Sequence, residues 1–224
     1  MADSLKERYT AVKAALPAQV KLIAVSKTRT VEEIRALYDL GQRVFGENYP
    51  QELREKQPLL PADIEWHFIG HLQTNKVKYL APFVHMVHAV DSEKLLDELE
   101  KRAAANDRDI AILFQVHVAQ EETKHGFLPK DLLAALPAWT PWRWPHLIPS
   151  GLMAMATFTD DRAQVAREFA LVSKLHGEIR DMGIFPGDRF TELSMGMSDD
   201  LEEAIAAGSS MVRIGTALFG KRTG

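Results

Sequence analysis

The stretch Lys21-Leu-Ile-Ala-Val-Ser-Lys27 decides the fold, because the rest of the chain repeats the pattern that begins here. Its apolar run is typical of a buried β-strand, which we place at about residues 20–26. A helical pattern over 31–40 follows, and Gly41 stands where helices commonly end. One strand followed by one helix makes a βα unit.

The βα pattern recurs along the whole chain. We predict further strands at the apolar stretches 43–46, 64–69, 85–90, 110–118, 148–154, 190–194 and 211–214. Helical patterns lie between or after them at 75–80, 92–99, 128–136, 162–182, 199–207 and 217–219. Alternation of this kind indicates a parallel sheet, and eight units favour an α/β fold of the closed (β/α)8 TIM barrel type over an open doubly wound sheet.

One helix and the domain boundaries complete the predicted architecture. A helix over about 4–16, capped by Asp3-Ser4, should precede the first strand. No linker and no change in composition interrupts the pattern, so residues 1–224 are expected to form a single domain.

Composition limits the classes of protein to which the chain can belong. Of its 224 residues, 46% are hydrophobic and 26% are charged, which is ordinary for a soluble globular domain. The formal net charge of −4 argues against broad nucleic-acid binding, and the absence of cysteine excludes disulfides and thiolate metal sites. The chain begins without an apolar signal core and has no membrane-length apolar run, so we expect a cytoplasmic protein without a membrane or nucleic-acid partner.

Lys27 places an amine at the end of the first buried strand, where an isolated charge is costly to desolvate. A lysine in this position commonly packs its stem and extends its ammonium to solvent. The alternative is a lysine that forms a Schiff base with an aldehyde or another carbonyl compound, for which burial lowers the amine pKa. The residues at the other strand ends decide between the two.

Small and hydroxyl-bearing residues follow the last two predicted strands, at Ser194-Met-Gly-Met-Ser198 and Arg213-Ile-Gly-Thr216. Barrels of this class commonly bind phosphate beside strands seven and eight, where backbone N–H groups can approach its oxygens. A structural interpretation is equally open, since Ser198 can cap the helix at 199–207 and Gly215 can relieve crowding.

Alternation along the eighth strand directs Arg213 inward at the barrel mouth, with Val212 and Ile214 facing outward. A buried arginine normally has an ion-pair partner. Glu192 on the neighbouring strand is the candidate.

The histidines form no metal motif in the sequence. His67 stands between two aromatic residues, a setting typical of a hydrogen-bonded core histidine. His85, His88 and His117 lie on the fourth and fifth strands without the carboxylate spacing of a zinc site, so we predict no metal site. The tryptophan-rich stretch 137–145 is expected to pack on the outer surface of the barrel, with an exposed interaction loop as the alternative.

Seven segments in order carry a family resemblance: Leu22-Ile-Ala-Val-Ser-Lys-Thr28, Phe45-Gly-Glu-Asn-Tyr49, Glu65-Trp-His-Phe-Ile-Gly70, Leu72-Gln-Thr-Asn-Lys76, Gly151-Leu-Met153, Leu193-Ser-Met-Gly-Met-Ser-Asp-Asp200 and Val212-Arg-Ile-Gly-Thr216. The sequence resembles the YggS/PROSC family of pyridoxal phosphate homeostasis proteins, which is similar to the barrel domain of alanine racemases. The resemblance implies an alanine racemase N-terminal domain-like barrel that holds pyridoxal 5′-phosphate (PLP) as an internal aldimine.

Carried over to this sequence, the resemblance implies that Lys27 forms the Schiff base and that Arg213 faces the pyridine nitrogen. Seven further cofactor-binding residues are implied, three at the phosphate and four around the ring: Ser194, Gly215, Thr216, and Asn48, His67, Met153 and Met195. It implies no catalytic residue and no metal ligand. The chain departs from the family at Arg29-Thr30, at His117 and in the tryptophan-rich loop, which leaves the lysine and phosphate segments intact.

The chemistry implied by the resemblance favours a protein that holds the cofactor over one that uses it. A permanently charged arginine at the pyridine nitrogen disfavours a pyridinium and weakens the ring as an electron sink. The chain ends about eight residues after Thr216 and its four tyrosines all precede residue 80, so we do not expect the second domain and tyrosine base of alanine racemases.

We therefore expect a monomeric PLP carrier or buffer in intracellular PLP homeostasis, with PLP-dependent apo-enzymes as recipients. Two enzymatic alternatives remain open from the sequence. One is a low-activity amino-acid racemase with His67 or another group as its second acid/base, and the other is a Schiff-base aldolase for a sugar phosphate.

Overall fold

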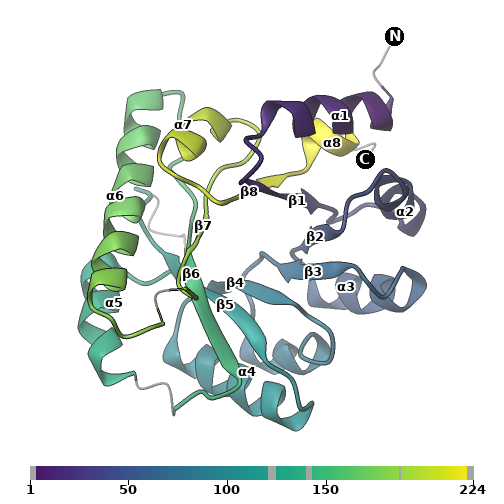
Figure 1. The fold of residues 1–224 in the computed structure, drawn as a ribbon. Helices are drawn as coiled ribbons and strands as arrows, with labels where there is room; N and C mark the ends of the chain where they lie inside the picture. The colour runs from purple at the N-terminus through teal and green to yellow at the C-terminus, as the bar shows by residue number, and fades with distance from the viewer. Residues whose placement is uncertain (1–3, 121–124, 140–142, 187, 221–224) are drawn as a thin grey trace.

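Eight parallel strands close into a barrel at the centre of the molecule (Figure 1). The computed structural model describes residues 4–120, 125–139, 143–186 and 188–220. Each strand pairs with the next one in the chain, and the eighth pairs with the first to close the ring. The strands are β1 (Lys21–Val25), β2 (Val44–Glu47), β3 (Glu65–Phe68), β4 (Met86–Val90), β5 (Ile110–Val116), β6 (Leu147–Ala154), β7 (Glu192–Ser194) and β8 (Met211–Ile214).

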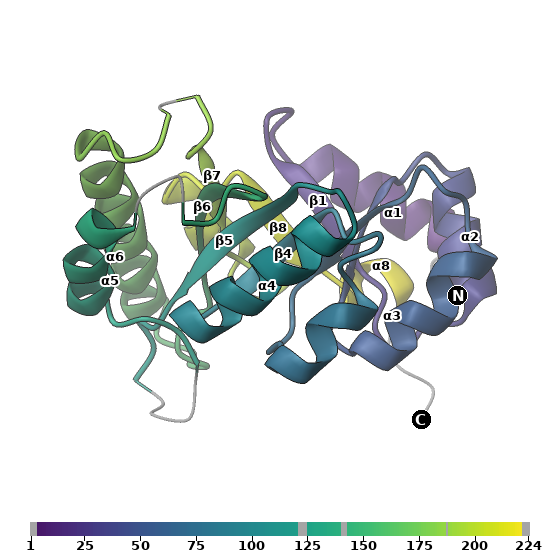
Figure 2. The same ribbon diagram turned by 90° about the horizontal axis from the view of Figure 1, so that it is seen from below.

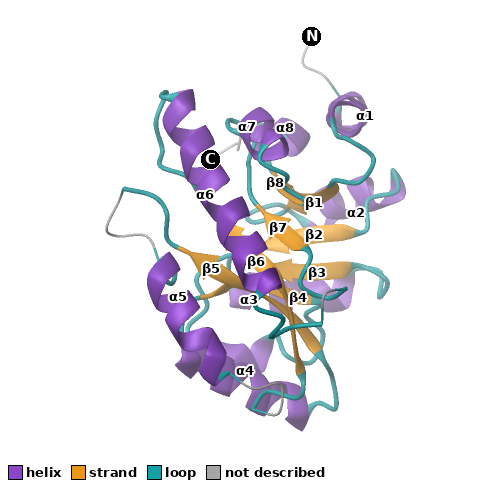
Figure 3. Ribbon diagram, turned by 60° about the vertical axis from the view of Figure 1, so that its left-hand side comes forward, coloured by secondary structure: helices purple, strands orange, loops and turns teal. Residues whose placement is uncertain are grey.

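Helices surround the barrel, as the view from below and the view coloured by secondary structure show (Figures 2 and 3). The α-helices are α1 (Leu5–Ala15), α2 (Val31–Asp39), α3 (Pro50–Lys56), α4 (Glu93–Ala105), α5 (Pro129–Ala135), α6 (Arg162–Asp181), α7 (Leu201–Ala206) and α8 (Thr216–Phe219). Three short 3-10 helices accompany them, η1 (Gln57–Leu59), η2 (Thr74–Tyr79) and η3 (Leu136–Ala138). None of the helices in the described part of the chain is both long enough and apolar enough to cross a membrane.

Local sequence signals explain how the two ends of the chain meet. Ser4 and Glu7 form a capping box that begins α1, as the predicted N-cap requires. Helix α1 then packs against α8, with Arg8 Nε donating to Leu218 O at 2.7 Å. The first and last helices therefore lie side by side where β1 and β8 close the barrel (Figure 1).

Alternating side chains divide the apolar interior into two regions. The larger region lies between the strands and the helices and receives outward-facing residues such as Val212 and Ile214. The smaller one fills the barrel itself, around Ile23 and Met211. Arg213 shares the inward face of β8 with Met211 and is 5% exposed, which confirms the predicted direction of its side chain.

The predicted (β/α)8 barrel is confirmed, with strand ends that differ by one or two residues. The predicted helix at 75–80 is a 3-10 helix. Trp139 and Trp144 are buried, and their indole N–H groups donate to Glu93 and Asp97 of α4 at 2.9 and 2.8 Å. Packing on the outer surface is therefore confirmed for these two tryptophans, while Trp142 lies outside the described residues.

Candidate functional site

A cavity of about 520 Å³ lies at the carboxyl ends of the strands. Barrel proteins of this class bind their ligands at this end. Five of the predicted cofactor residues line the cavity: Lys27, Asn48, Arg213, Gly215 and Thr216. The remaining lining residues are Val25, Arg29, Ile69, Met155, Met197, Ser198, Asp199 and Ala217.

Lys27 reaches the cavity from a tight turn that follows β1. Arg29 N donates to Ser26 O at 3.0 Å and closes this turn. Thr28 adopts φ of 63°, a left-handed conformation that is uncommon and costly for a β-branched residue. The side chain of Lys27 is partly buried. The left-handed conformation of Thr28 persists only where neighbouring residues hold the backbone in place.

A buried ion-pair network under the turn, here called the Lys56 clamp, consists of Ser26, Glu47, Glu52 and Lys56. Lys56 Nζ donates to Ser26 O and Glu47 Oε1, both at 2.8 Å, and to Glu52 Oε1 at 2.5 Å. Ser26 Oγ donates to Glu47 Oε1 at 2.6 Å, while Thr28 N donates to Glu52 Oε1 at 2.5 Å. Burial raises the pKa of Glu47, and the charge of Lys56 opposes that shift. The clamp thus fixes the backbone on both sides of Lys27.

Gly215, Thr216 and Ala217 form another wall of the cavity, where β8 passes into α8. The first N–H groups of a helix have no acceptor within it, and no side chain caps α8. A Cβ on Gly215 would lie 3.3 Å from Val25 Cβ, so crowding also favours glycine at this position. The structure supports the crowding interpretation of Gly215, and its contact with a phosphate stays a prediction.

Ser198 lines the cavity, and the prediction that it caps the following helix was wrong. Helix α7 begins at Leu201 with Asp200 at its N-cap position. Asp200 Oδ1 accepts a hydrogen bond from Met197 N at 2.5 Å, which folds the loop back before the helix starts. Because the helix begins later than its pattern indicated, the Ser198 hydroxyl belongs to the cavity wall.

Arg213 is held by oxygens of the two preceding strands. Its Nη1 lies 2.7 Å from both Ser194 O and Ser194 Oγ, and its Nη2 lies 3.1 Å from Ala154 O. Burial lowers the pKa of Arg213 to about 10, which leaves the guanidinium charged at neutral pH. A fixed positive charge therefore faces the cavity.

The predicted partner of Arg213, Glu192, was wrong. The β7–β8 register pairs Ser194 with Met211, which places Glu192 towards the amino end of the barrel and Arg213 towards the carboxyl end. Glu192 accepts a hydrogen bond from Ser210 Oγ instead. Neutral oxygens thus replace the expected ion pair.

A hydrogen-bonded chain continues from Arg213 through the barrel. Ser194 Oγ lies 2.9 Å from His88 Nδ1, and His88 Nε2 lies 2.8 Å from His67 Nδ1. Burial, reinforced by neighbouring positive charges, lowers the pKa of both imidazoles well below 6.5. Both rings are therefore neutral at pH 7.

The neutral histidine pair predicts a loss of stability in mild acid. On unfolding, His67 and His88 regain a pKa near 6.5, so below that pH the unfolded state binds protons that the folded rings do not. The free energy of unfolding should therefore fall with pH, by up to about 1.4 kcal/mol per pH unit for each ring, until the folded pKa is reached.

Urea unfolding between about pH 7.5 and pH 5, with EDTA present, measures this slope. His88→Asn should reduce the slope. His146→Gln is the control, because hydrogen bonding to Glu100 raises the pKa of that partly exposed ring and its loss should not reduce acid sensitivity. An unchanged slope in His88→Asn would contradict the inference that buried, neutral His88 causes the loss of stability in acid.

Four predicted cofactor residues are buried and do not line the cavity: His67, Met153, Ser194 and Met195. His67 and Ser194 belong to the hydrogen-bonded chain, and the two methionines pack in the apolar regions. Met155 and Met197, each two residues further along, line the cavity in their place. A direct contact of these four with a cofactor stays a prediction.

Asn48 lines the cavity and carries an unsatisfied polar atom. Its Oδ1 is buried and has no hydrogen-bond partner. An unpaired buried acceptor costs about 1–3 kcal/mol, and a contact of Asn48 with a cofactor stays a prediction. Gly70 allows this placement, since a Cβ there would lie 2.5 Å from Asn48 O.

Comparison with known proteins places this chain in a family. It matches the model of the alanine racemase N-terminal domain over residues 2–223. The pyridoxal phosphate homeostasis protein of Aquifex aeolicus is 42% identical over 204 residues, which cover 90% of this chain and 87% of that protein. The human pyridoxal phosphate homeostasis protein is 39% identical over 219 residues, which cover 92% and 78%.

Solved structures give the same result. PipY of Synechococcus elongatus, solved without PLP and with PLP bound, superposes with TM-scores of 0.90 and 0.87 at 36% and 35% identity, over 97% of this chain and 100% of PipY. An alanine racemase of Clostridium difficile shares the barrel fold, with a TM-score of 0.73 at 13% identity over 98% of this chain and 56% of the racemase. The chain therefore belongs to the alanine racemase N-terminal domain family and, within it, to the pyridoxal phosphate homeostasis proteins.

Proposed function

We propose that this protein binds PLP through a Schiff base to Lys27 and acts as an intracellular carrier or buffer of the cofactor. The observation that carries the proposal is that one cavity gathers Lys27, the cation of Arg213 and the small residues at the start of α8. An aldehyde needs an amine, and a phosphate is commonly held by hydroxyls and helix N–H groups. The relatives' name and the PLP-bound PipY structure support the same ligand.

The polar residues that line the cavity suit the polar groups of PLP. The unpaired Oδ1 of Asn48 offers a polar contact, and the hydroxyls of Ser198 and Thr216 line the same cavity. When bound, PLP supplies an aldehyde carbon for the amine and a ring that can act as an electron sink. Ser194 belongs to this proposal as the residue that fixes Arg213, through its two contacts of 2.7 Å.

The lining favours storage of the aldehyde over its use in catalysis. Arg213 is charged and buried, so it disfavours a protonated pyridine beside it. Among the described residues that line the cavity, none is a histidine or a tyrosine that could serve as a second base. His67, the base of the racemase alternative, lies within the barrel and bonds to His88. The carrier therefore ranks ahead of the racemase.

The test of the site is the replacement of Lys27. Purified protein loaded with PLP and treated with borohydride should gain one reduced phosphopyridoxyl group, mapped by mass spectrometry to Lys27. Lys27→Ala should lose this covalent label entirely, because no amine remains to form the bond. Lys94→Ala, which removes an exposed lysine of α4, is the control and should label as the wild type does. Equal labelling of Lys27→Ala would overturn the assignment.

The carrier role has its own test, separate from the site. We expect the loaded monomer to transfer PLP to a PLP-dependent apo-enzyme, measured as recovery of that enzyme's activity. Alanine or serine incubated with the loaded protein in deuterium oxide should show no enzymic exchange at Cα. Exchange at enzymic rates would contradict the carrier role and support the racemase alternative.

A further inference from the structure

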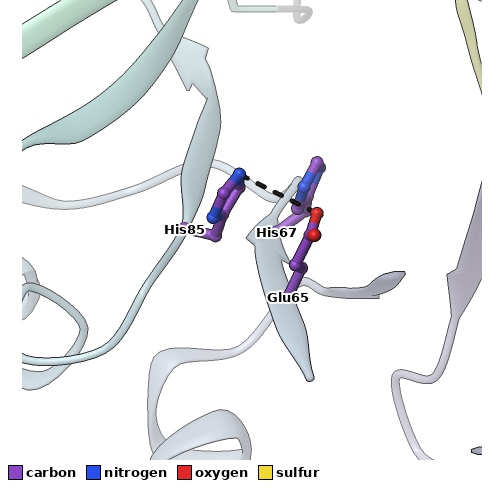
Figure 4. Close-up of side chains that lie close together, drawn as sticks. All are labelled: Glu65, His67 and His85. Atoms are coloured by element: carbon purple, nitrogen blue, oxygen red, sulfur yellow. Dashed lines mark ion pairs between the residues drawn. The ribbon is translucent and has the colours of Figure 1, made fainter. Parts of the chain in front are cut away.

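A cluster of metal-ligand side chains, drawn in Figure 4, lies at the amino-terminal end of the barrel, and the cavity lies at the carboxyl end. Glu65 begins β3, His67 follows on the same inward face, and His85 directly precedes β4. One ligand atom from each residue lies within 4.8 Å of the other two. Glu65 and His85 point toward one another, with Oε2 and Nε2 3.8 Å apart. Because two strands supply the cluster, sequence spacing gave no sign of it.

His67 is the member that indicates a missing ligand. It is fully buried, its Nδ1 lies 2.8 Å from His88 Nε2, and its Nε2 has no hydrogen-bond partner. An unpartnered buried nitrogen costs about 1–3 kcal/mol. Histidines that bind a metal through one ring nitrogen usually hydrogen-bond through the other, which fixes the tautomer. His67 has this arrangement, with Nε2 as the nitrogen left for the cluster.

We propose that Glu65, His67 and His85 bind a divalent cation of the zinc class. Two imidazole nitrogens and one carboxylate oxygen suit Zn²⁺, Co²⁺ or Ni²⁺, with water in the remaining positions. Bonds of about 2.0–2.2 Å require the three ligand atoms to draw together. The side chains of Glu65 and His85 are 41% and 49% exposed and can rotate, while His67 is fixed by burial.

A cation at this end would orient the hydrogen-bonded chain that reaches the cavity. A metal on His67 Nε2 requires the ring proton on Nδ1, which then donates to His88 Nε2. His88 must in turn donate from Nδ1 to Ser194 Oγ, beside the contact from Arg213. The proposal holds whether or not the cavity binds PLP.

A second group, also made of two histidines and one carboxylate, serves as the comparison. His71, Asp91 and His125 also gather within 4.8 Å, on loops at the cavity end. His71 Nδ1 and His125 Nδ1 lie 3.2 and 3.9 Å from Asp91 Oδ2, so ion pairing explains why these three side chains lie together. Both rings are exposed, and the group holds none of the described buried unpaired atoms.

Equilibrium dialysis of the purified protein against Zn²⁺, with a zinc indicator as competitor, tests the site. Glu65→Gln and His85→Ala each keep a partly exposed position and should fold. Each should weaken zinc binding by at least about tenfold, which is the effect of removing even an outer partner of a metal site. His125→Ala is the matched control and should bind as the wild type does.

Two further measurements test whether His67 is one of the residues that bind the zinc ion. Lys21→Gln removes a positive charge that acts on His67 and should tighten zinc binding. Long-range ¹H–¹⁵N spectra should show Zn²⁺ shifting the His67 Nε2 resonance while Nδ1 stays protonated. Zinc binding that survives both Glu65→Gln and His85→Ala, or that is lost only in His125→Ala, would overturn the proposal and leave an adventitious ion only.

Discussion

Replacing Lys56 by methionine should lower the free energy of unfolding by about 3–5 kcal/mol, the usual cost of removing one partner of a buried ion pair. Lys56 is the cation of the clamp, and the side chain of Glu47 is 0% exposed. Among the ion pairs of the described residues, Glu47 has no cation besides Lys56, and its Oε2 is already unpaired. Urea unfolding at pH 7 measures the loss.

The double variant Glu47→Gln/Lys56→Met is the control for this mechanism. It removes both charges and leaves an amide that can still accept from Ser26, so it should recover much of the stability. A pH series adds a second criterion for Lys56→Met. Because burial raises the pKa of Glu47, its protonation should restore stability as pH falls towards 4.5, and stability should be lost as pH rises through the raised pKa. A loss below about 1 kcal/mol, without this pH dependence, would contradict the clamp.

The clamp also links stability to the site. Its hydrogen bonds hold Ser26 O and Thr28 N, on either side of Lys27. Lys56→Met should therefore reduce covalent loading by PLP although Lys27 itself is unchanged. Loading equal to that of the wild type would show that the turn keeps its conformation without the clamp.

The barrel was predictable because each unit repeats a local signal. Apolar runs mark the strands, and caps such as Ser4 and glycines such as Gly41 mark helix ends within a few residues of sequence. Strand β7 keeps only Glu192–Ser194 of the predicted 190–194, because pairing with its neighbours, rather than propensity, sets strand length. The onset of α7 moved for a similar reason, the turn closed by Asp200.

The site residues that could be predicted are those whose placement depends only on their position along a strand. The alternation that directs Arg213 inward, and the position of Lys27 just after β1, follow from the order of residues. The clamp and the role of His88 were missed because their contacts join residues far apart in the chain. Nothing in a single sequence sets His88 beside Ser194, 106 residues away.

Gly151 illustrates a residue whose reason appears only in the fold. It belongs to a segment of the family resemblance, yet its sequence neighbours do not explain why it is glycine. In the barrel it has φ of 153°, and a Cβ would lie 1.8 Å from Glu192 O. It follows a register irregularity in β6 and lets β7 approach closely. Ala154 O and Ser194 O, which hold Arg213, come from these two strands.

Gly151→Ala should accordingly lower the free energy of unfolding by roughly 2–6 kcal/mol, since overpacking and a backbone conformation suited to glycine each cost about 1–3 kcal/mol. Gly183→Ala separates the two causes, because Gly183 has φ of 65° and a Cβ added there would meet nothing within 4 Å, so only the backbone cost applies. Gly177→Ala, in the open interior of α6, should instead stabilise by about 0.5–1 kcal/mol. Urea unfolding of the three variants ranks them, and the close approach of β6 and β7 requires Gly151→Ala to lose the most. If Gly151→Ala and Gly183→Ala lost the same stability, only the backbone cost would apply at Gly151, and the close approach of β6 and β7 would not be the reason for glycine there.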